Sequence, residues 1–301
     1  MTDIIKFDDE WLPITEKVFT RWVQYQLEAN SKHSINDVTK DLATGTTILN
    51  LAQALTHRKC SSKKEISQNC DIALKMFKED GVKIVGITGK DITYHNTELI
   101  LRLIWKLIKH YSIRYSFVNH DNKLNGFQNE TGEVMTSKLL TWAVNRIENY
   151  SNTYAFKPYE LSMLQLISTF YPEKVNCSNL NPKDFKNNFE LLINIMNDLR
   201  IPCFIFPEDV IKIGSEIDQK ILLTQLAVAK IVLENQIQKE EKVENIESTK
   251  NNNLNDYKDK HINNSEKKIN IEVETQTANN QKDEKGNKKE MKQSEKPRFD
   301  K

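Results

Sequence analysis

The sequence predicts an all-α protein with two helical domains in tandem, followed by a disordered charged tail. Three observations support this prediction. One helical pattern occurs twice, opening at residues 19–27 and 139–147 and closing with strongly apolar stretches at 99–113 and 220–233. No segment alternates apolar and polar residues as a half-buried strand does. From residue 236 onward Lys, Glu, Asp, Asn and Gln dominate the composition. The pattern therefore indicates a duplicated helical unit with an appended tail.

The first predicted domain spans residues 11–113 and follows a leader, residues 1–10, that we expect to be mobile. Its opening helix has an apolar face at helical spacing, formed by Phe19, Trp22, Val23 and Leu27. The stretch 99–113 leaves little polar surface, which is typical of a central helix surrounded by others. A small helical domain is the expected result.

The second predicted domain spans residues 137–235 and follows a hydrophilic linker at 114–136. Its opening helix repeats the apolar face with Leu139, Trp142, Ala143 and Ile147. The tail at 236–301 has few aromatic or branched residues, so it cannot bury enough apolar area to offset the entropy of ordering it. We therefore expect the tail to be disordered.

The composition excludes several classes of protein. A hydrophobic content of 38% with 28% charged residues is typical of a soluble globular protein. The net charge of +1 argues against a nucleic-acid partner held by general attraction to phosphates. No uncharged apolar run is long enough for membrane insertion, and the N-terminus lacks a signal core, so we expect a cytoplasmic protein. Four cysteines and six histidines are dispersed, which indicates neither a metal site nor a cofactor.

The ordered motifs resemble the tandem calponin-homology actin-binding domain of alpha-actinin, filamin and spectrin-like proteins. The resemblance covers about residues 11–235. In the first unit it rests on residues 17–23, 41–45, 81–87 and 101–108, and in the second on residues 139–142, 201–202, 207–210 and 218–220. The second domain is divergent, because residues 161–166 replace a Ser-Trp-x-Asp-Gly stretch that the family commonly has. In the first domain, Thr44 stands where a second acidic residue is usual.

The resemblance implies a protein that binds the side of actin filaments in the actin cytoskeleton. Domain 1 is expected to make most contacts and domain 2 to modulate access. Family contact segments correspond here to 19–27, 99–113 and 139–154. The candidate contact residues are Arg21, Gln24, Tyr25, Lys83, Arg102, Trp105, Lys106 and Lys109. The last four are spaced three or four residues apart and so share one helix face. The alternative is that Trp105 is a core residue and the basic residues form a solvated face.

The resemblance also implies an interdomain latch between Trp105 and Lys220, a lysine facing an indole ring. Phosphoinositide binding is not indicated, because the corresponding stretch 147–162 has Lys157 as its only formal cation. No phosphate-binding loop or local nucleophile motif is present, so an enzyme is not expected. The oligomeric state is left open, and bundling of filaments would require a dimer or a second site. The alternative function is a cytoskeletal adaptor or scaffold that binds a signalling protein or microtubules through the same fold.

Overall fold

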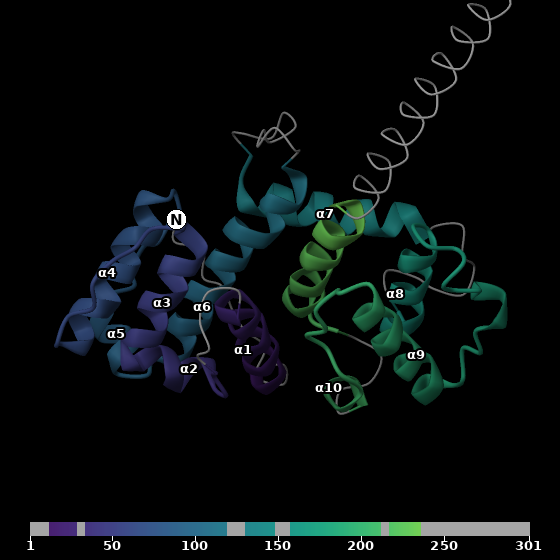
Figure 1. Ribbon diagram of the computed structural model, residues 1–301, viewed down its shortest axis with the longest axis horizontal. Helices are drawn as coiled ribbons and strands as arrows, with labels where there is room; N and C mark the ends of the chain where they lie inside the picture. The colour runs from purple at the N-terminus through teal and green to yellow at the C-terminus, as the bar shows by residue number, and fades with distance from the viewer. Residues whose placement is uncertain (1–11, 29–33, 119–129, 148–156, 212–216, 236–301) are drawn as a thin grey trace, which may run out of the picture. The chain divides into compact units, whose positions relative to one another are not determined.

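The computed structural model describes residues 12–28, 34–118, 130–147, 157–211 and 217–235, all within one compact unit, Met1–Ile237. The predicted leader at 1–10, residues 119–129 of the predicted linker and the tail from 236 lie outside the described residues. The described residues contain helices and no β-strand, which confirms the predicted all-α fold class (Figure 1).

The first half of the described chain contains six α-helices and a π-helical turn. The α-helices are α1 (Leu12–Glu28), α2 (Val38–Asp41), α3 (Thr46–Thr56), α4 (Ile66–Glu79), α5 (Gly89–Thr93) and α6 (Thr97–Ile108). The π-helical turn Lys109–Ile113 continues α6, and a 3₁₀ turn, Tyr115–Phe117, follows it.

The core of this half is built around α1 and α6. Phe19, Trp22, Val23 and Leu27 are fully buried, as their helical spacing predicts. The indole Nε1 of Trp22 donates a hydrogen bond of 2.9 Å to the hydroxyl of Ser112 in the π-helical turn. This bond satisfies the one polar atom of a fully buried side chain and ties α1 to the end of the central helix.

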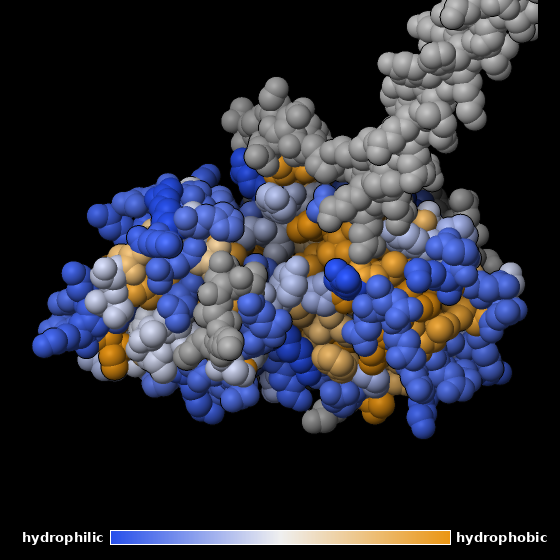
Figure 2. All heavy atoms as spheres, viewed as in Figure 1, coloured by the Kyte–Doolittle hydropathy of each residue, from blue (hydrophilic) through white to orange (hydrophobic). Residues whose placement is uncertain are grey.

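The second half contains α7 (Gly132–Ile147), α8 (Tyr159–Ser168), α9 (Phe185–Asp198) and α10 (Pro207–Ile211). Residues 219–235 are also helical and are called the closing helix below. Leu226, Ala227, Ala229 and Leu233 of the closing helix are fully buried. Figure 2 shows apolar residues gathered over this helix.

The duplication predicted from the sequence is visible in matching helix ends. After α4, the Val82 amide bonds the Phe77 carbonyl at 3.0 Å, and after α9 the Ile201 amide bonds the Met196 carbonyl at 2.8 Å. Such six-to-one bonds define a Schellman motif, which requires a left-handed residue just past the helix. Gly81, with φ of 95°, has this role in the first half, and Arg200, with φ of 56°, has it in the second.

Candidate functional site

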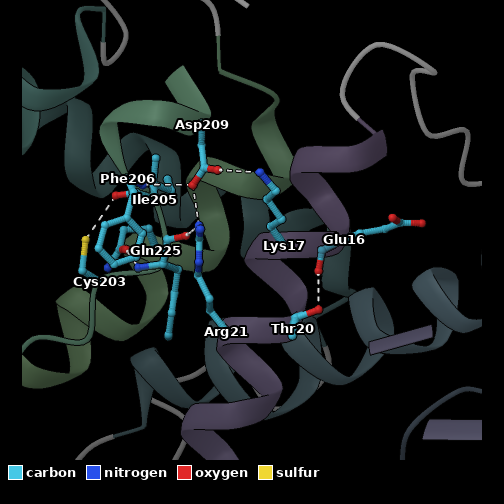
Figure 3. A network of polar contacts seen from close by, with 10 residues as sticks. Glu16, Lys17, Thr20, Arg21, Cys203, Ile205, Phe206, Asp209 and Gln225 are labelled. Carbon is cyan, nitrogen blue, oxygen red and sulfur yellow. Dashed lines mark hydrogen bonds and ion pairs between the residues drawn. The ribbon is translucent and has the colours of Figure 1, made fainter. Parts of the chain in front are cut away.

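Arg21 on α1 reaches out of the first half and contacts the loop before α10. Its Nη1 donates to the Phe204 carbonyl at 2.7 Å and to the Asp209 carboxylate (Figure 3). The guanidinium also lies over the Phe206 ring, 4.6 Å from its centroid. A planar cation thus has an acceptor, a counter-charge and an aromatic face within reach at once.

Asp209 is a buried carboxylate, with a side chain 1% exposed. Its Oδ2 accepts a 3.1 Å bond from the Phe206 amide at the start of α10, and its Oδ1 lies 3.8 Å from the Lys17 ammonium. A buried charge is tolerated only with compensating partners, and both cations come from α1. The ion-paired residues Lys17, Arg21 and Asp209 are called the α1 clamp below.

The loop that meets Arg21 is positioned by the closing helix. Gln225 is fully buried, and its Oε1 accepts from the Phe204 amide at 2.8 Å while its Nε2 donates to the Pro202 carbonyl at 2.9 Å. Burial raises the pKa of the neighbouring Cys203 thiol to about 11, so this thiol stays protonated at neutral pH. The loop therefore presents a neutral, fixed backbone carbonyl to Arg21.

The other two candidates on α1 have different surroundings. The Tyr25 ring meets the Phe204 ring edge-on, with centroids 5.9 Å apart, so it also contacts the second half. Gln24 instead stays within the first half: its Nε2 donates to Glu28 at 3.0 Å, and its Oε1 accepts from the Ile35 amide at 2.9 Å. Lys83, in the loop after α4, is exposed.

Trp105 on α6 lies in the core and is 6% exposed. Its ring is stacked on Phe19, with centroids 6.3 Å apart and an interplanar angle of 3°. The geometry therefore agrees with the core alternative for this ring. The basic residues beside it are half-buried, and Arg102 lies 3.7 Å from Glu98 in an i,i+4 ion pair.

Lys109 makes a second ionic contact between the two halves. Its ammonium donates to Glu133 on α7 at 2.7 Å and lies 5.9 Å from the centroid of the Trp105 ring. This hydrogen bond lowers the pKa of the Glu133 carboxyl, which keeps it ionised at neutral pH. Lys109 and Arg21 are thus both held by carboxylates from the second half.

The latch predicted between Trp105 and Lys220 stays a prediction. The Lys220 ammonium lies 3.5 Å from the Asp218 carboxylate in this structure. The Trp105 ring has Phe19 and Lys109 as partners.

Lys230 on the closing helix was not among the residues predicted from the sequence. Its ammonium is 5.0 Å from the centroids of both the Phe117 and Trp142 rings, and it pairs with Glu234. Burial lowers the pKa of Lys230. The sequence does contain a sign of this role, because Lys230 is the single lysine in the apolar run 221–233. A lysine in such a run is either buried with compensating partners or interrupts the apolar face of the helix.

Two properties of the described residues concern other functions. None of their helices combines the length and the apolar character needed to cross a membrane. No group of three or more His, Cys, Asp or Glu side chains in the described part of the chain is arranged to hold a metal ion.

Comparison with known proteins places this geometry in context. Residues 13–113 match the calponin homology (CH) domain model. Interaptin of Dictyostelium discoideum is 30% identical over 227 residues, which cover 70% of this chain and 13% of that protein. Microtubule-actin cross-linking factor 1 of Mus musculus is 28% identical over 222 residues, covering 69% of this chain and 3% of that protein.

A solved structure shows the same fold. The actin-crosslinking core of Schizosaccharomyces pombe fimbrin matches with a TM-score of 0.53 at 20% identity, covering 76% of this chain and 49% of that one. At this identity the likeness concerns the fold alone. The chain spans only a part of each of these relatives.

Proposed function

We propose that this chain, a non-enzymatic member of the calponin-homology family with two such domains in tandem, binds the side of actin filaments. Residues 13–113 match the family model, and a relative and a solved structure are named for actin cross-linking. We place the protein in the actin cytoskeleton on the same grounds. A single module of this kind decorates a filament, whereas bundling requires a second site.

The first domain is proposed to supply most of the filament contacts. Its candidate contact surface is the set Arg21, Gln24, Tyr25, Lys83, Arg102, Trp105, Lys106 and Lys109. Cations dominate this set, which suits an acidic protein partner. Since Trp105 is 6% exposed, its contribution would require its surroundings to rearrange.

The second domain is proposed to modulate access to this surface. The observation that carries this proposal is the α1 clamp: the bonds of Arg21 to Asp209 and the Phe204 carbonyl hold its guanidinium toward the second half and compensate its charge. Lys109 pairs with Glu133 at the start of α7, just before the predicted second domain, and this carboxylate is 63% exposed. A partner must compete with these contacts, so their free energy is subtracted from the free energy of filament binding.

High-speed co-sedimentation with filamentous actin tests both statements. Asp209→Asn removes the charge of the clamp but keeps an oxygen that accepts the Phe206 amide. If releasing the clamp recovers about 1–2 kcal/mol, filament affinity rises about five- to thirtyfold. The matched control is Glu208→Gln, an adjacent exposed carboxylate, which should leave affinity unchanged.

A double variant separates the two roles of Arg21. Arg21→Ala combined with Asp209→Asn should bind filaments more weakly than Asp209→Asn alone, because the filament contact is lost while the clamp is already open. Equal binding by the single and double variants would remove Arg21 from the contact surface. Absence of pelleting by the wild type and by Asp209→Asn would overturn the actin proposal and make the adaptor alternative the leading one.

A further inference from the structure

A cavity of about 510 Å³ lies apart from the α1 clamp, where the ends of α1 and α3 meet the π-helical turn and the closing helix. Its volume falls within the range of small-molecule sites, about 300–1,000 Å³. Tyr25 and Leu55 contribute walls from the first half, and Val228 and Ile231 contribute walls from the closing helix. Among the candidate contact residues, Tyr25 also lines this cavity.

Two backbone irregularities border the cavity. His57, which ends α3, has a φ of 55°, a left-handed conformation that costs energy for a residue with a β-carbon. The π-helical turn inserts an extra residue into the helix and brings His110, Tyr111 and Ser112 to the wall. π-turns and strained backbone positions concentrate at functional sites, and here both lie at one cavity.

The polar groups of the wall favour a negatively charged occupant. The single carboxylate of the lining, Asp80, is already engaged: the Tyr111 hydroxyl donates to its Oδ2 at 2.8 Å, and Arg58 lies 3.3 Å from its Oδ1. His57 and Arg114 are further residues of the lining whose side chains carry N–H donors. Since a guanidinium carries five N–H donors, Arg114 can bind a ligand in addition to a protein partner.

The apolar part of the wall favours an occupant with a flat or apolar body. The rings of Tyr25, Tyr111 and Tyr115 and the side chains of Leu55 and Ile231 line this part. Burial lowers the pKa of His110, so its imidazole is a neutral polar group at neutral pH. An apolar body bearing one anionic group matches both parts of the wall.

We propose that this cavity binds a small organic anion, an aromatic or apolar body that carries a phosphate or carboxylate, with Arg114 and His57 at the anionic group. Because the walls come from both halves of the molecule, a bound ligand holds the closing helix against α1 and the π-helical turn. In a protein that binds filaments as proposed above, the ligand would therefore weaken filament binding. This last consequence rests on the proposed function, whereas the site itself does not.

The test is a titration of the full chain with 1-naphthyl phosphate, followed by ligand-observed NMR and isothermal calorimetry without actin. Inorganic phosphate supplies the anion alone and 1-naphthol supplies the body alone. We expect saturable binding of 1-naphthyl phosphate at least tenfold tighter than either control. Arg114→Gln should weaken it about tenfold or more, because a charge-assisted hydrogen bond is lost.

Ile231→Trp fills the cavity from a half-buried position and should also abolish binding, while Lys186→Gln, an exposed residue of α9, should leave binding unchanged. Circular dichroism checks that each variant is folded. If Ile231→Trp is not folded, Arg114→Gln alone tests the site. No saturable binding, or equal binding by wild type and Arg114→Gln, would overturn the site. Addition of the probe to co-sedimentation then tests its effect on actin separately, since the site can bind the probe whether or not pelleting changes.

Discussion

The ammonium of Lys230 lies 5.0 Å from the centre of the Phe117 ring. This contact joins the closing helix to the end of the first half. The same ammonium lies 5.0 Å from the Trp142 ring, and Arg146 lies 4.3 Å from the centroid of Phe170 beyond it. Cations and rings therefore alternate from Phe117 to Phe170. Lys230 is 5% exposed, so this contact is shielded from salt, whereas Lys17 in the α1 clamp is 47% exposed.

Replacement of Lys230 tests the strength of this contact. Lys230→Glu places a carboxylate between two ring faces and beside Glu234, so we expect a loss of about 3–5 kcal/mol in the free energy of unfolding. Lys230→Met keeps the apolar body and a sulfur–aromatic contact, and its loss should stay below about 1.5 kcal/mol. Urea denaturation measures both, with Lys186→Glu as the exposed control. If Lys230→Glu and Lys230→Met lowered the free energy of unfolding equally, the positive charge of Lys230 would not be what stabilises its contact with the rings.

Ser112→Ala tests the hydrogen bond at the centre of the first half. The change removes one hydroxyl and leaves the Trp22 indole N–H buried without its acceptor, so we expect a loss of about 1–3 kcal/mol. For a chain of this size that corresponds to a fall of about 2–4 °C in Tm for each kcal/mol. Ser137→Ala, on the exposed side of α7, should change Tm by less than about 2 °C, because surface substitutions usually change stability by less than about 0.5 kcal/mol. If Ser112→Ala changed Tm as little as Ser137→Ala does, this would contradict the hydrogen bond between Trp22 and Ser112.

Glu160→Gln tests a buried carboxyl in the second half. Burial raises the pKa of Glu160, which is 2% exposed and has an Oε2 without a hydrogen-bond partner. A folded-state pKa above the unfolded one means that ionisation destabilises the fold: stability falls as pH rises from the usual value of 4.5 through the raised pKa. Glutamine removes this penalty, so the variant should be more stable than wild type at pH 7 and lose its advantage below pH 4.5. Thermal melts across this range measure the difference, and a variant less stable at pH 7 would contradict it.

Arg200→Gly tests the left-handed residue that ends α9. Arginine at φ of 56° has a strained backbone that glycine does not have, although glycine also gains freedom in the unfolded chain. We expect a net gain of about 0.5–1 kcal/mol. The reciprocal change, Gly81→Ala at the matching end of α4, should destabilise by about 1 kcal/mol or more, because its Cβ meets only ordinary contact distance at His110 and the cost comes from the backbone. An increase in stability from both Arg200→Gly and Gly81→Ala would contradict the Schellman motif that we assign to both helix ends.

Much of the helical architecture was predictable because its signal is local. The spacing of Phe19, Trp22 and Val23 predicted the buried face of α1, and the structure confirms it. The apolar composition of residues 99–108 predicted a central helix, and Ile100 to Ile108 are buried apart from Arg102 and Lys106. The contacts of the candidate residues were harder to predict from the sequence. A periodic pattern predicts which helix face a residue occupies, but it does not predict which element packs against that face.

The sequence by itself determined the all-α class and the duplicated pattern, because helix periodicity depends on residues three and four apart. The candidate contact surface rests on the family resemblance and stays a prediction. Only the tertiary structure decided that Arg21 meets Asp209, that Trp105 stacks on Phe19 in the core, and that Lys230 lies between Phe117 and Trp142. Each of these contacts joins residues far apart in the chain. Their formation depends on how whole helices pack to bury apolar area and to compensate buried charge, which no local spacing records.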